Sequence, residues 1–494
     1  MSAQPRTRDA VPATGSVPPP IAVDLDGTLT CSDTLAESLV RVSRDAPLRL
    51  LSLLPHLMRG RAAFKEAVAA HARVNPATLP YREPLLAYLR EQRTQGRSIV
   101  LATAAHVSIA RDVADHLRLF DDVLATEGGR NLKGRDKLQA CRERFPDGFV
   151  YAGDGRADLA VWAGAQGAIL VGVDHRTAQA VGRAVDIEHQ FPRQRPTLLD
   201  WLRTLRIHQW LKNLLLFVPL LTSFRFTEAA LLHTTVLAFV AFSLVASATY
   251  VLNDLWDLEN DRAHARKRER AFASGRIPIV HGIAAAVFAL ALGFGLALTL
   301  VPGFGAMLLA YLVLTVSYSR ALKRHVLVDV IILSLLYTMR VLAGSVAIGV
   351  ATSSWLLALC AFAFLSLALA KRCSELVLVA SAGKHATRGR DYRVSDLAVL
   401  QPMGLAAAMA SVVVFGLFIS APETQARYAT PQLLWLVAFA MTYWLGRLWI
   451  KTSRGEIVDD PLVYALTDRS SLLAVVAMVV TVLGAHYVDL GLWR

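Results

Sequence analysis

The densest group of acidic residues in the chain lies in the stretch from Asn253 to Pro278, directly after an apolar run. Asp254 is followed by Asp257 and Asp261, at intervals of three and four residues. On a helix these intervals place the three carboxylates on one face. Crowded carboxylates repel one another unless a cation lies between them, and Mg²⁺ prefers such oxygen ligands. The stretch therefore predicts a magnesium site, although an ordinary charged loop between two membrane helices would explain part of the pattern.

Basic residues follow the acidic ones at once, and they include Arg262, Arg266, Lys267, Arg268 and Arg270. Guanidinium and ammonium groups bind anionic oxygens through charge-assisted hydrogen bonds. The stretch therefore combines a place for a metal ion with a place for an anion.

A second group of candidate residues lies within the first 200 residues, next to short apolar runs. Asp24 and Asp26 follow one such run. Asp154 and Asp158 follow another, and Thr103 ends a third. Runs of this kind are typical of buried strands, and in parallel sheets the chemistry collects at the carboxyl ends of the strands. These side chains are therefore expected at one edge of a sheet.

The elements that must position these residues alternate between strand and helix. The predicted strands are at residues 21–23, 98–103, 122–125, 149–152 and 168–173. Residues 107–119 and 136–144 have helical patterns, and the segment from about 35 to 90 is mostly helical with several prolines. This alternation predicts an α/β fold with a largely parallel sheet.

From about residue 211 onward, long apolar segments alternate with short charged loops. Nine segments are predicted to span a membrane, at about 212–224, 232–252, 281–300, 303–319, 326–349, 354–376, 401–420, 432–450 and 471–489. A helix needs about 20 apolar residues to cross a bilayer, and the first segment is shorter than that. The second half of the chain therefore predicts an all-α polytopic membrane domain of about nine transmembrane helices.

Lysine and arginine are distributed unequally between the predicted loops. Four loops on one side hold 18 of these residues, and they are 253–280, 320–325, 371–396 and 451–470. The opposite connections and the C-terminus hold three, which are Arg225, Arg427 and Arg494. Because cytoplasmic loops carry the excess of positive charge, the acidic stretch and the N-terminal domain are predicted to be cytoplasmic and the C-terminus external. Residues 1–20 lack the apolar core of a signal peptide, which agrees with this orientation.

The length of 494 residues exceeds one ordinary domain. The predicted parts are a flexible N-terminus, an α/β domain, a basic linker and a membrane domain, at residues 1–19, 20–192, 193–211 and 212–494. The net charge is +13, but the basic residues lie mostly beside predicted spans. Anionic lipid headgroups and phosphorylated substrates are therefore the expected partners, and nucleic acid is not. The four cysteines are scattered, and they predict neither a zinc site nor a disulfide framework.

Two ionisable residues, Asp329 and Arg340, lie within one predicted span. A charge inside a membrane is costly and usually functional, although an Asp329–Arg340 pair that only fixes helix packing is an alternative. Further polar clusters lie at residues 371–375, 384–392 and 459–469. Part of the charge in these clusters is expected to be solvated positive charge on the cytoplasmic side.

The motifs DLDGT (residues 24–28) and GDGRAD (residues 153–158) resemble the phosphoserine-phosphatase-like branch of the haloacid dehalogenase superfamily, over about residues 20–190. The resemblance implies a Rossmann-like phosphatase domain with a helical cap at about 33–90. It implies Asp24 as the nucleophile that becomes an aspartyl phosphate, and Asp26 as the general acid and base.

The same resemblance implies roles for the remaining residues of the two motifs and their neighbours. Thr103 would hold the phosphoryl group, and Lys137, or less favourably Lys133, would neutralise its charge. Asp24, Asp26 and Asp154 would bind Mg²⁺, with Asp158 supporting the metal and substrate. A degenerate domain that serves only as a scaffold is the alternative.

Five stretches of the second half carry another resemblance: RIHQWLKN (206–213), the acidic stretch 253–278, YSRALKRHVLVDV (318–330), KRCSEL (371–376) and DPLVYALTDRSS (460–471). They resemble the UbiA superfamily of intramembrane prenyltransferases over nearly all of 203–494, and within it the decaprenyl-phosphate phosphoribosyltransferases. The aromatic prenyltransferases of the superfamily carry more than one aspartate in the second acidic motif. Here Asp329 stands alone and basic residues precede it, which suits a more anionic small substrate.

This resemblance implies a Mg²⁺-dependent transfer of 5-phosphoribose from phosphoribosyl pyrophosphate to a polyprenyl phosphate lipid. Asp254 and Asp257 would be catalytic and would hold the metal together with Asp261. Substrate binding is implied for a set of mostly basic residues: Lys212, Asn253, Lys267, Arg268, Arg320, Lys323, Arg324, Asp329 and Arg340.

Together the two resemblances predict a bifunctional enzyme in the cytoplasmic membrane of a bacterium. The phosphatase domain would remove the 5-phosphate and give polyprenyl-phosphate ribose, a sugar donor for cell-envelope glycans. One alternative is an aromatic prenyltransferase of quinone-type biosynthesis with an accessory phosphatase domain. Another is a transporter or lipid-binding protein with a regulatory soluble domain. A homo-oligomer is compatible with the sequence.

Overall fold

The computed structural model describes residues 18–192, 195–386, 390–457 and 460–490. The N-terminal residues 1–17, as well as Arg193, Arg388, Asp459 and Arg494, lie outside the described residues. The chain divides into two compact units. The first consists of Met1–Thr204 and Leu252–Ala284, and the second of Leu205–Val251 and Ala285–Arg494. The acidic stretch therefore belongs by its contacts to the unit of the N-terminal domain, although it lies between two parts of the other unit in sequence.

Six strands form one parallel sheet in the first unit, in the order β3-β2-β1-β4-β5-β6. The strands are β1 Ile21–Val23, β2 Ile99–His106, β3 Asp122–Thr126, β4 Val150–Gly153, β5 Gly167–Val171 and β6 Asp186–Phe191. The predicted α/β fold with a parallel sheet is confirmed. The sequence did not predict β6, because five of its six residues are exposed and it contains no apolar run.

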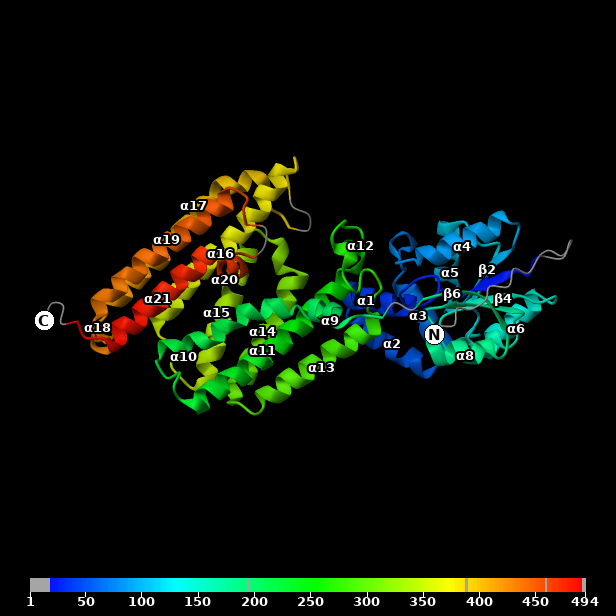
Figure 1. Ribbon diagram of the computed structural model, residues 1–494, viewed down its shortest axis with the longest axis horizontal. Coiled ribbons are helices and arrows are strands. Elements are labelled where there is room, and N and C mark those ends of the chain that lie inside the picture. The colour runs from blue at the N-terminus through cyan, green and yellow to red at the C-terminus, as the bar shows by residue number, and fades with distance from the viewer. Residues whose placement is uncertain (1–17, 193–194, 387–389, 458–459, 491–494) are drawn as a thin grey trace, which may run out of the picture. The chain divides into compact units, whose positions relative to one another are not determined.

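Helices cover both faces of the sheet (Figure 1). Ile21 and Val23 point to the face covered by α4 Glu83–Thr94 and α5 Val107–Leu117, whereas Ala22 points to the opposite face. The helices on that opposite face are α6 Arg135–Arg144, α7 Leu159–Trp162 and α8 His175–Gly182, and the 3-10 helix η2 Arg156–Asp158 precedes α7. The alternation of side chains along β1 thus divides the core of the domain into two layers.

The segment between β1 and β2 is helical, as the sequence predicted. It contains α1 Thr34–Asp45, α2 Arg49–Met58, α3 Arg61–His71 and the 3-10 helix η1 Pro76–Thr78. Asp33 caps α1, since its carboxylate accepts a hydrogen bond from the backbone N–H of Ala36. A small apolar core of Val42, Leu53, Val68 and Ala72 holds α1, α2 and α3 together. These three helices are called the cap below.

The first unit contains further short helices outside the sheet domain and the cap. They are α9 Leu198–Thr204, α12 Leu258–Arg262 and the 3-10 helix η4 Lys267–Glu269, with the last residues of α11 and the first of α13.

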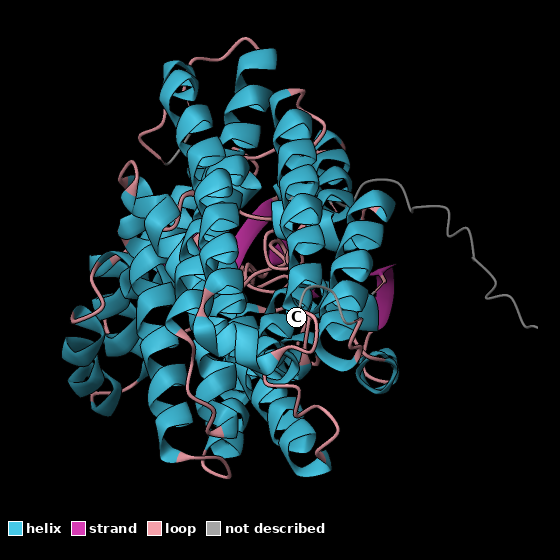
Figure 2. Ribbon diagram, turned by 90° about the vertical axis from the view of Figure 1, so that its left-hand side faces the viewer, coloured by secondary structure: helices cyan, strands magenta, loops and turns pink. Residues whose placement is uncertain are grey.

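The second unit is a bundle of long helices that run alongside one another (Figure 2). Eight described helices are long and apolar enough to cross a membrane. They are α11 Ala229–Trp256, α13 Ile279–Ala297, α14 Pro302–Arg320, α15 Val328–Ile348, α16 Ser354–Ser381, α17 Leu397–Ser420, α19 Leu434–Ser453 and α21 Arg469–Tyr487. Large apolar side chains such as Phe288, Val313 and Phe439 are exposed on these helices, as expected for surfaces that face lipid.

Eight of the nine predicted spans correspond to these helices. The first predicted span, at 212–224, is instead built from the 3-10 helix η3 Ile207–Phe217 and the five-residue helix α10 Val218–Thr222. Neither is as long as a membrane-spanning helix. Shorter elements connect the long ones: η5 Leu322–Arg324, η6 Val394–Asp396, α18 Pro422–Arg427, η7 Pro431–Leu433 and α20 Pro461–Thr467.

Candidate active sites

The phosphatase-like site is built around one buried lysine at the carboxyl ends of β1 and β4. Nζ of Lys137 lies 2.9 Å from Oδ2 of Asp24 and 3.6 Å from Oδ1 of Asp158. It also donates to the hydroxyl of Tyr151, which in turn donates to Asp158. Burial alone would lower the pKa of Lys137, but the two aspartates outweigh it and raise that pKa. Lys137 therefore carries its charge beside Asp24, whereas Lys133 is exposed.

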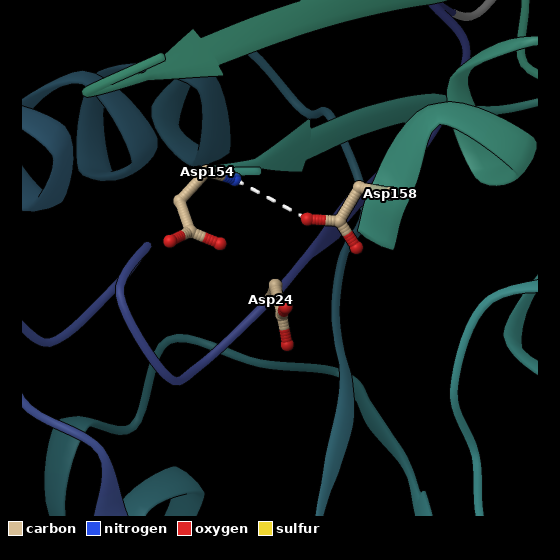
Figure 3. A group of neighbouring side chains, drawn as sticks. All are labelled: Asp24, Asp154 and Asp158. Carbon is tan, nitrogen blue, oxygen red and sulfur yellow. Dashed lines mark hydrogen bonds between the residues drawn. The ribbon is translucent and has the colours of Figure 1, made fainter. Parts of the chain in front are cut away.

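Three carboxylates of this site are close enough to hold a metal ion together. Each of Asp24, Asp154 and Asp158 offers one oxygen, and these oxygens lie within 4.8 Å of one another (Figure 3). Burial, and then the charges of Asp24 and Asp158, raise the pKa of Asp154 to about 7. Carboxylates crowded together in this way are the environment that a hard cation stabilises. The residues present therefore fit a divalent metal ion.

The turn that follows β1 brings the backbone close to this group. Gly27 has a φ of +78°, which a residue with a side chain rarely adopts, and a Cβ atom there would collide with the carboxylate of Asp154. The glycine of the DLDGT motif therefore allows Asp154 to approach the first strand.

Asp26 is positioned by the first turn of the cap. Its Oδ1 accepts a hydrogen bond of 2.8 Å from the backbone N–H of Thr34, at the start of α1. Burial, together with the neighbouring Asp33, raises the pKa of Asp26 to about 8. A carboxyl that stays protonated near neutral pH can donate a proton, which suits the general acid that the sequence predicted.

A cavity of about 430 Å³ opens in front of these residues. Asp24, Asp26, Lys137, Asp154 and Asp158 line it from the sheet, and the cap contributes Leu57, Arg61, Phe64 and Lys65. Sequence reasoning missed the basic residues of the cap, because nothing in the spacing of Arg61 and Lys65 relates them to the motifs. Lys65 lies 2.9 Å from Oδ1 of Asn131, another lining residue.

Thr103 takes a different position from the expected one. It lies inside β2 rather than at its end, since the strand continues to His106. Its side chain is fully buried and accepts a hydrogen bond from the backbone N–H of Ala105. Within the described part of the chain, the residues that line the cavity from β2 are Ala104, Ala105 and His106.

The acidic stretch forms a second candidate site. Asn253 and Asp254 lie in the last turn of α11, and Asp261 lies in α12. Nη1 of Arg270 is 3.2 Å from Asp254 and 2.7 Å from Asp261, so one guanidinium bridges two of the three predicted metal ligands. Asp254 and Asp261 therefore share the positive charge of Arg270. Asp257 is partly exposed, and Lys267 and Arg268 are exposed in and around η4.

The acidic stretch is held against the cap by a buried ion pair. Both terminal nitrogens of Arg262 donate to the carboxylate of Glu37 in α1, at 2.7 and 3.0 Å, and both side chains are less than a tenth exposed. Nε of Arg262 donates to the carbonyl of Ala273. Arg41 of the same helix pairs with Glu259 at 2.7 Å. Helix α1 therefore contacts Asp26 at its start and the acidic stretch along its length.

In the second unit, two lysines converge on one carboxylate. Lys212 of η3 and Lys371 of α16 lie 2.7 and 2.9 Å from Oδ2 of Asp460. The hydroxyl of Tyr337 also donates to Asp460, at 3.1 Å. Of these residues the sequence singled out only Lys212 as substrate-binding, because the others lie 125 to 248 positions away. Asp460 stands in a charged cluster that the sequence did mark, and it begins α20 as its N-cap.

The alternative of an Asp329–Arg340 pair is wrong. Asp329 lies 2.7 Å from Arg372, and both side chains are completely buried. It also accepts a hydrogen bond from Tyr318. Arg340 instead donates to Asn213 at 2.9 Å and to the hydroxyl of Tyr311 at 3.1 Å.

Asp329 is at the start of α15 and Arg340 is three turns further on, about 16 Å along the helix axis, so their side chains are too far apart to pair. The other predicted phosphate-binding residues lie at the beginning of the connection to α15. Arg320 ends α14, and Lys323 and Arg324 form part of η5.

Comparison with known families gives two matches. Residues 21–162 match the haloacid dehalogenase-like hydrolases, and residues 216–464 match the UbiA prenyltransferase family. The chain belongs to the UbiA prenyltransferase family. Its UbiA domain follows a haloacid dehalogenase-like domain, so that both resemblances found in the sequence are confirmed. With eight candidate spans, the UbiA domain makes the chain a multi-pass membrane protein.

Three relatives differ in how much of this chain they match. An uncharacterised protein of Sinorhizobium fredii, y4nM, is 43% identical over 92% of this chain and 88% of its own length. Nodulation protein NoeC of Azorhizobium caulinodans is 36% identical over 55% of this chain and 89% of its own. Decaprenyl-phosphate phosphoribosyltransferase of Corynebacterium glutamicum is 29% identical over 61% of this chain and 92% of its own. The last two therefore align almost completely with little more than half of this chain.

Proposed function

We propose that the UbiA domain transfers 5-phosphoribose from phosphoribosyl pyrophosphate to a polyprenyl phosphate, and that the phosphatase domain then removes the 5-phosphate. The observation that carries this proposal is the pairing of two sites in one chain. A UbiA domain similar to a decaprenyl-phosphate phosphoribosyltransferase is joined to a domain whose cavity holds the residues for hydrolysing a phosphate ester.

In the transfer step, an oxygen of the lipid phosphate attacks the anomeric carbon of the ribose, and the bond from that carbon to the diphosphate breaks. Asp254, Asp257 and Asp261 would hold Mg²⁺, which would neutralise charge on the departing diphosphate. Asn253 would orient the donor. Lys267, Arg268, Arg320, Lys323 and Arg324 are positively charged candidates for its phosphate groups.

The lysines on Asp460 supply a second place for an anion. Lys212 and Lys371 are held close together by one carboxylate, and their like charges favour any further negative group. Arg340 and Asp329 lie on α15, the helix that also provides Tyr337. We assign Lys212 and Arg340 to substrate binding and Asp329 to the support of Arg372.

In the hydrolysis step, the carboxylate of Asp24 attacks the phosphorus of the 5-phosphate, and the bond from phosphorus to the ribose oxygen breaks. Asp26 gives its proton to that oxygen. Asp26 then takes a proton from water, which attacks the aspartyl phosphate and releases inorganic phosphate. Lys137 neutralises charge on Asp24 and on the bound phosphate. Mg²⁺ held by Asp24 and Asp154, with Asp158 in support, would neutralise the remaining phosphate charge.

The test is a product analysis with the purified full chain, polyprenyl phosphate, phosphoribosyl pyrophosphate and Mg²⁺. Mass spectrometry should detect polyprenyl-phosphate ribose with the intact chain and its 5-phosphorylated form with Asp24→Asn. An unchanged product in that variant would refute the phosphatase assignment. Consumption of a prenyl diphosphate instead of phosphoribosyl pyrophosphate would favour a quinone-type prenyltransferase, and no turnover of either would favour a transporter or binding protein.

The site of these reactions is proposed to be the cytoplasmic side of a bacterial inner membrane. The unequal distribution of lysine and arginine between the loops supports this orientation.

A further inference from the structure

Helix α2 of the cap is apolar on the side that faces away from the cap core. Met58 is 92% exposed, Leu48 80% and Leu51 65%, and Leu54 and Leu57 are more than half exposed. Scattered single apolar residues on a surface are normal, but a contiguous group of five large ones marks an interaction site.

The outward side chains are not needed for the packing of the cap. Leu50 and Leu53 of the same helix already pack on the cap core with Val42 and Val68. Leu51, Leu54 and Met58 follow one another at intervals of three and four residues, so they form a separate stripe along the helix. The helix thus has one apolar stripe that packs on the cap core and another whose side chains are exposed among the residues that the structure describes.

Positive charges flank the exposed stripe. Arg49, Arg59 and Arg61 are exposed around it, and Glu66 is the only acidic residue between Pro47 and His71. An apolar face bordered by arginines is the composition of helices that lie in the interface of an anionic membrane. The domain is already tied to a bilayer, because the chain continues into a membrane-spanning bundle.

The exposed stripe also leads to the phosphatase cavity. Leu57 of α2 and Arg61 at the start of α3 belong both to this surface and to the lining of the cavity. Gly60 connects the two helices with a φ of +106°.

We propose that α2 lies in the headgroup region of the bilayer and opens the phosphatase cavity toward lipid. Leu48, Leu51, Leu54 and Met58 insert among the acyl chains, and Arg49 and Arg59 bind the headgroup phosphates of anionic lipids. A phosphate ester anchored to an isoprenoid then reaches Asp24 without leaving the membrane. The lipid-anchored nature of this substrate depends on the proposed function, whereas the contact of α2 with the bilayer does not.

The first experiment measures the depth of α2 in the membrane. The full chain carries Cys31→Ser, and a nitroxide spin label is attached through Leu54→Cys. As a control, the label is attached through Gln139→Cys in α6, which lies away from α2 in the same domain (Figure 1). The protein is reconstituted in vesicles of phosphatidylcholine with one quarter phosphatidylglycerol, and collisions of the label with oxygen and with a water-soluble nickel chelate are recorded.

The label at position 54 should collide with oxygen and be protected from the chelate, whereas the label at position 139 should be accessible to the chelate. Equal access of the chelate to both positions would overturn the proposal. So would protection of position 54 from both reagents, because a second copy of the chain or another protein segment would then cover the helix.

The second experiment separates access to lipid from catalysis. The double variant Leu51→Gln, Leu54→Gln leaves the cavity lining intact. Its hydrolysis of a lipid-linked phosphate in vesicles should fall about tenfold, since apolar burial in the membrane is lost. Its hydrolysis of soluble p-nitrophenyl phosphate should stay within twofold of the parent. Equal loss on both substrates would overturn the proposal.

A third experiment compares the arginines beside the exposed stripe with an arginine of α6. Arg49→Glu with Arg59→Glu should remove the dependence of lipid hydrolysis on phosphatidylglycerol, and Arg142→Glu in α6 should leave it unchanged. If the parent chain hydrolyses no phosphate ester at all, the proposed phosphatase function fails, while the spin-label result still decides the membrane contact.

Discussion

The haloacid dehalogenase-like domain, for which we propose phosphatase activity, and the membrane unit bury opposite excesses of charge. In the phosphatase domain, three aspartates gather around Lys137. In the membrane unit, Lys212 and Lys371 share the single carboxylate of Asp460. Buried charge of one sign is stabilised by a ligand of the other sign. The group around Lys137 therefore favours an added cation, and the group around Asp460 favours an added anion.

Removal of the nucleophile should have the largest effect. Asp24→Asn takes the attacking carboxylate away from Lys137, and the rate of phosphate-ester hydrolysis should fall on the order of 10⁴-fold or more. The transfer of phosphoribose should continue. Hydrolysis of p-nitrophenyl phosphate measures the first effect and lipid mass spectrometry the second. Asp136→Asn, at an exposed acid of α6, should behave like the parent.

The ion pair between Glu37 and Arg262 balances one buried charge with another and provides the next test. Glu37→Gln leaves the guanidinium of Arg262 buried without a counter-charge, which should cost about 3 kcal/mol of local stability. Hydrogen exchange of residues 258–273 should accelerate accordingly. Glu37→Leu with Arg262→Met removes both charges and should restore much of the protection. Unchanged exchange in the single variant would show that the pair contributes little.

Addition of Mg²⁺ should stabilise the group of aspartates around Lys137. It should not stabilise the group of two lysines on Asp460. At a Mg²⁺ concentration about 100 times the dissociation constant, binding adds about 2.7 kcal/mol to the stability of the phosphatase domain. Exchange of the β4 backbone amides should slow by the corresponding factor, and Asp154→Asn should abolish the effect. An equal response in that variant would place the metal elsewhere.

Substitutions of the two lysines on Asp460, or of Asp460 itself, should change substrate binding. Lys371→Met should raise the KM of a phosphorylated substrate about 10- to 100-fold, since one charge-assisted contact is lost. Asp460→Asn releases both lysines, so that inorganic pyrophosphate should inhibit more strongly. Lys384→Met, at an exposed lysine of the next loop, is the control and should leave KM unchanged. A lower KM in Lys371→Met together with weaker inhibition by pyrophosphate in Asp460→Asn would refute an anion site on these lysines.

The smallest expected effect is at an exposed ion pair. Arg225 and Glu228 are each about half exposed and lie 2.6 Å apart. Arg225→Ala should leave the stability almost unchanged, because solvent already screens both charges. A larger loss, measured by thermal unfolding, would show that exposed pairs in this chain are not screened as expected.

Much of the fold could be predicted because local patterns determine it. The runs before Asp24 and Asp154 are short and apolar, as buried strands are, and the long apolar segments of the second half are long enough to cross a bilayer. Strand β6 could not be found in this way, since an edge strand with exposed polar residues lacks an apolar pattern. The segment 212–224 was predicted as one span because its apolar residues satisfy hydropathy, whereas the structure divides this part of the chain into the 3-10 helix η3 and the helix α10.

The candidate sites were predictable only within each motif. DLDGT and GDGRAD placed their acids correctly at neighbouring strand ends, because the topology of parallel sheets brings such ends together. The partners of Asp329 and Lys212 could not be predicted. Arg372 and Asp460 lie 43 and 248 positions away, and tertiary packing rather than spacing selects them. The sequence singled out Arg270 as a basic residue, but it did not predict that Arg270 would pair with Asp254 and Asp261.

Helix α1 contacts Asp26 through the N–H of its first residue and Arg262 through Glu37 one turn later. A gene that encoded the transmembrane bundle by itself, starting after residue 204, would keep Arg262 but lose the acid that balances it. The boundary between the two units therefore does not coincide with the basic linker at residues 193–211. Anyone who separates them by truncation, or fuses the bundle to a new hydrolase, must replace this single carboxylate or remove the arginine that depends on it.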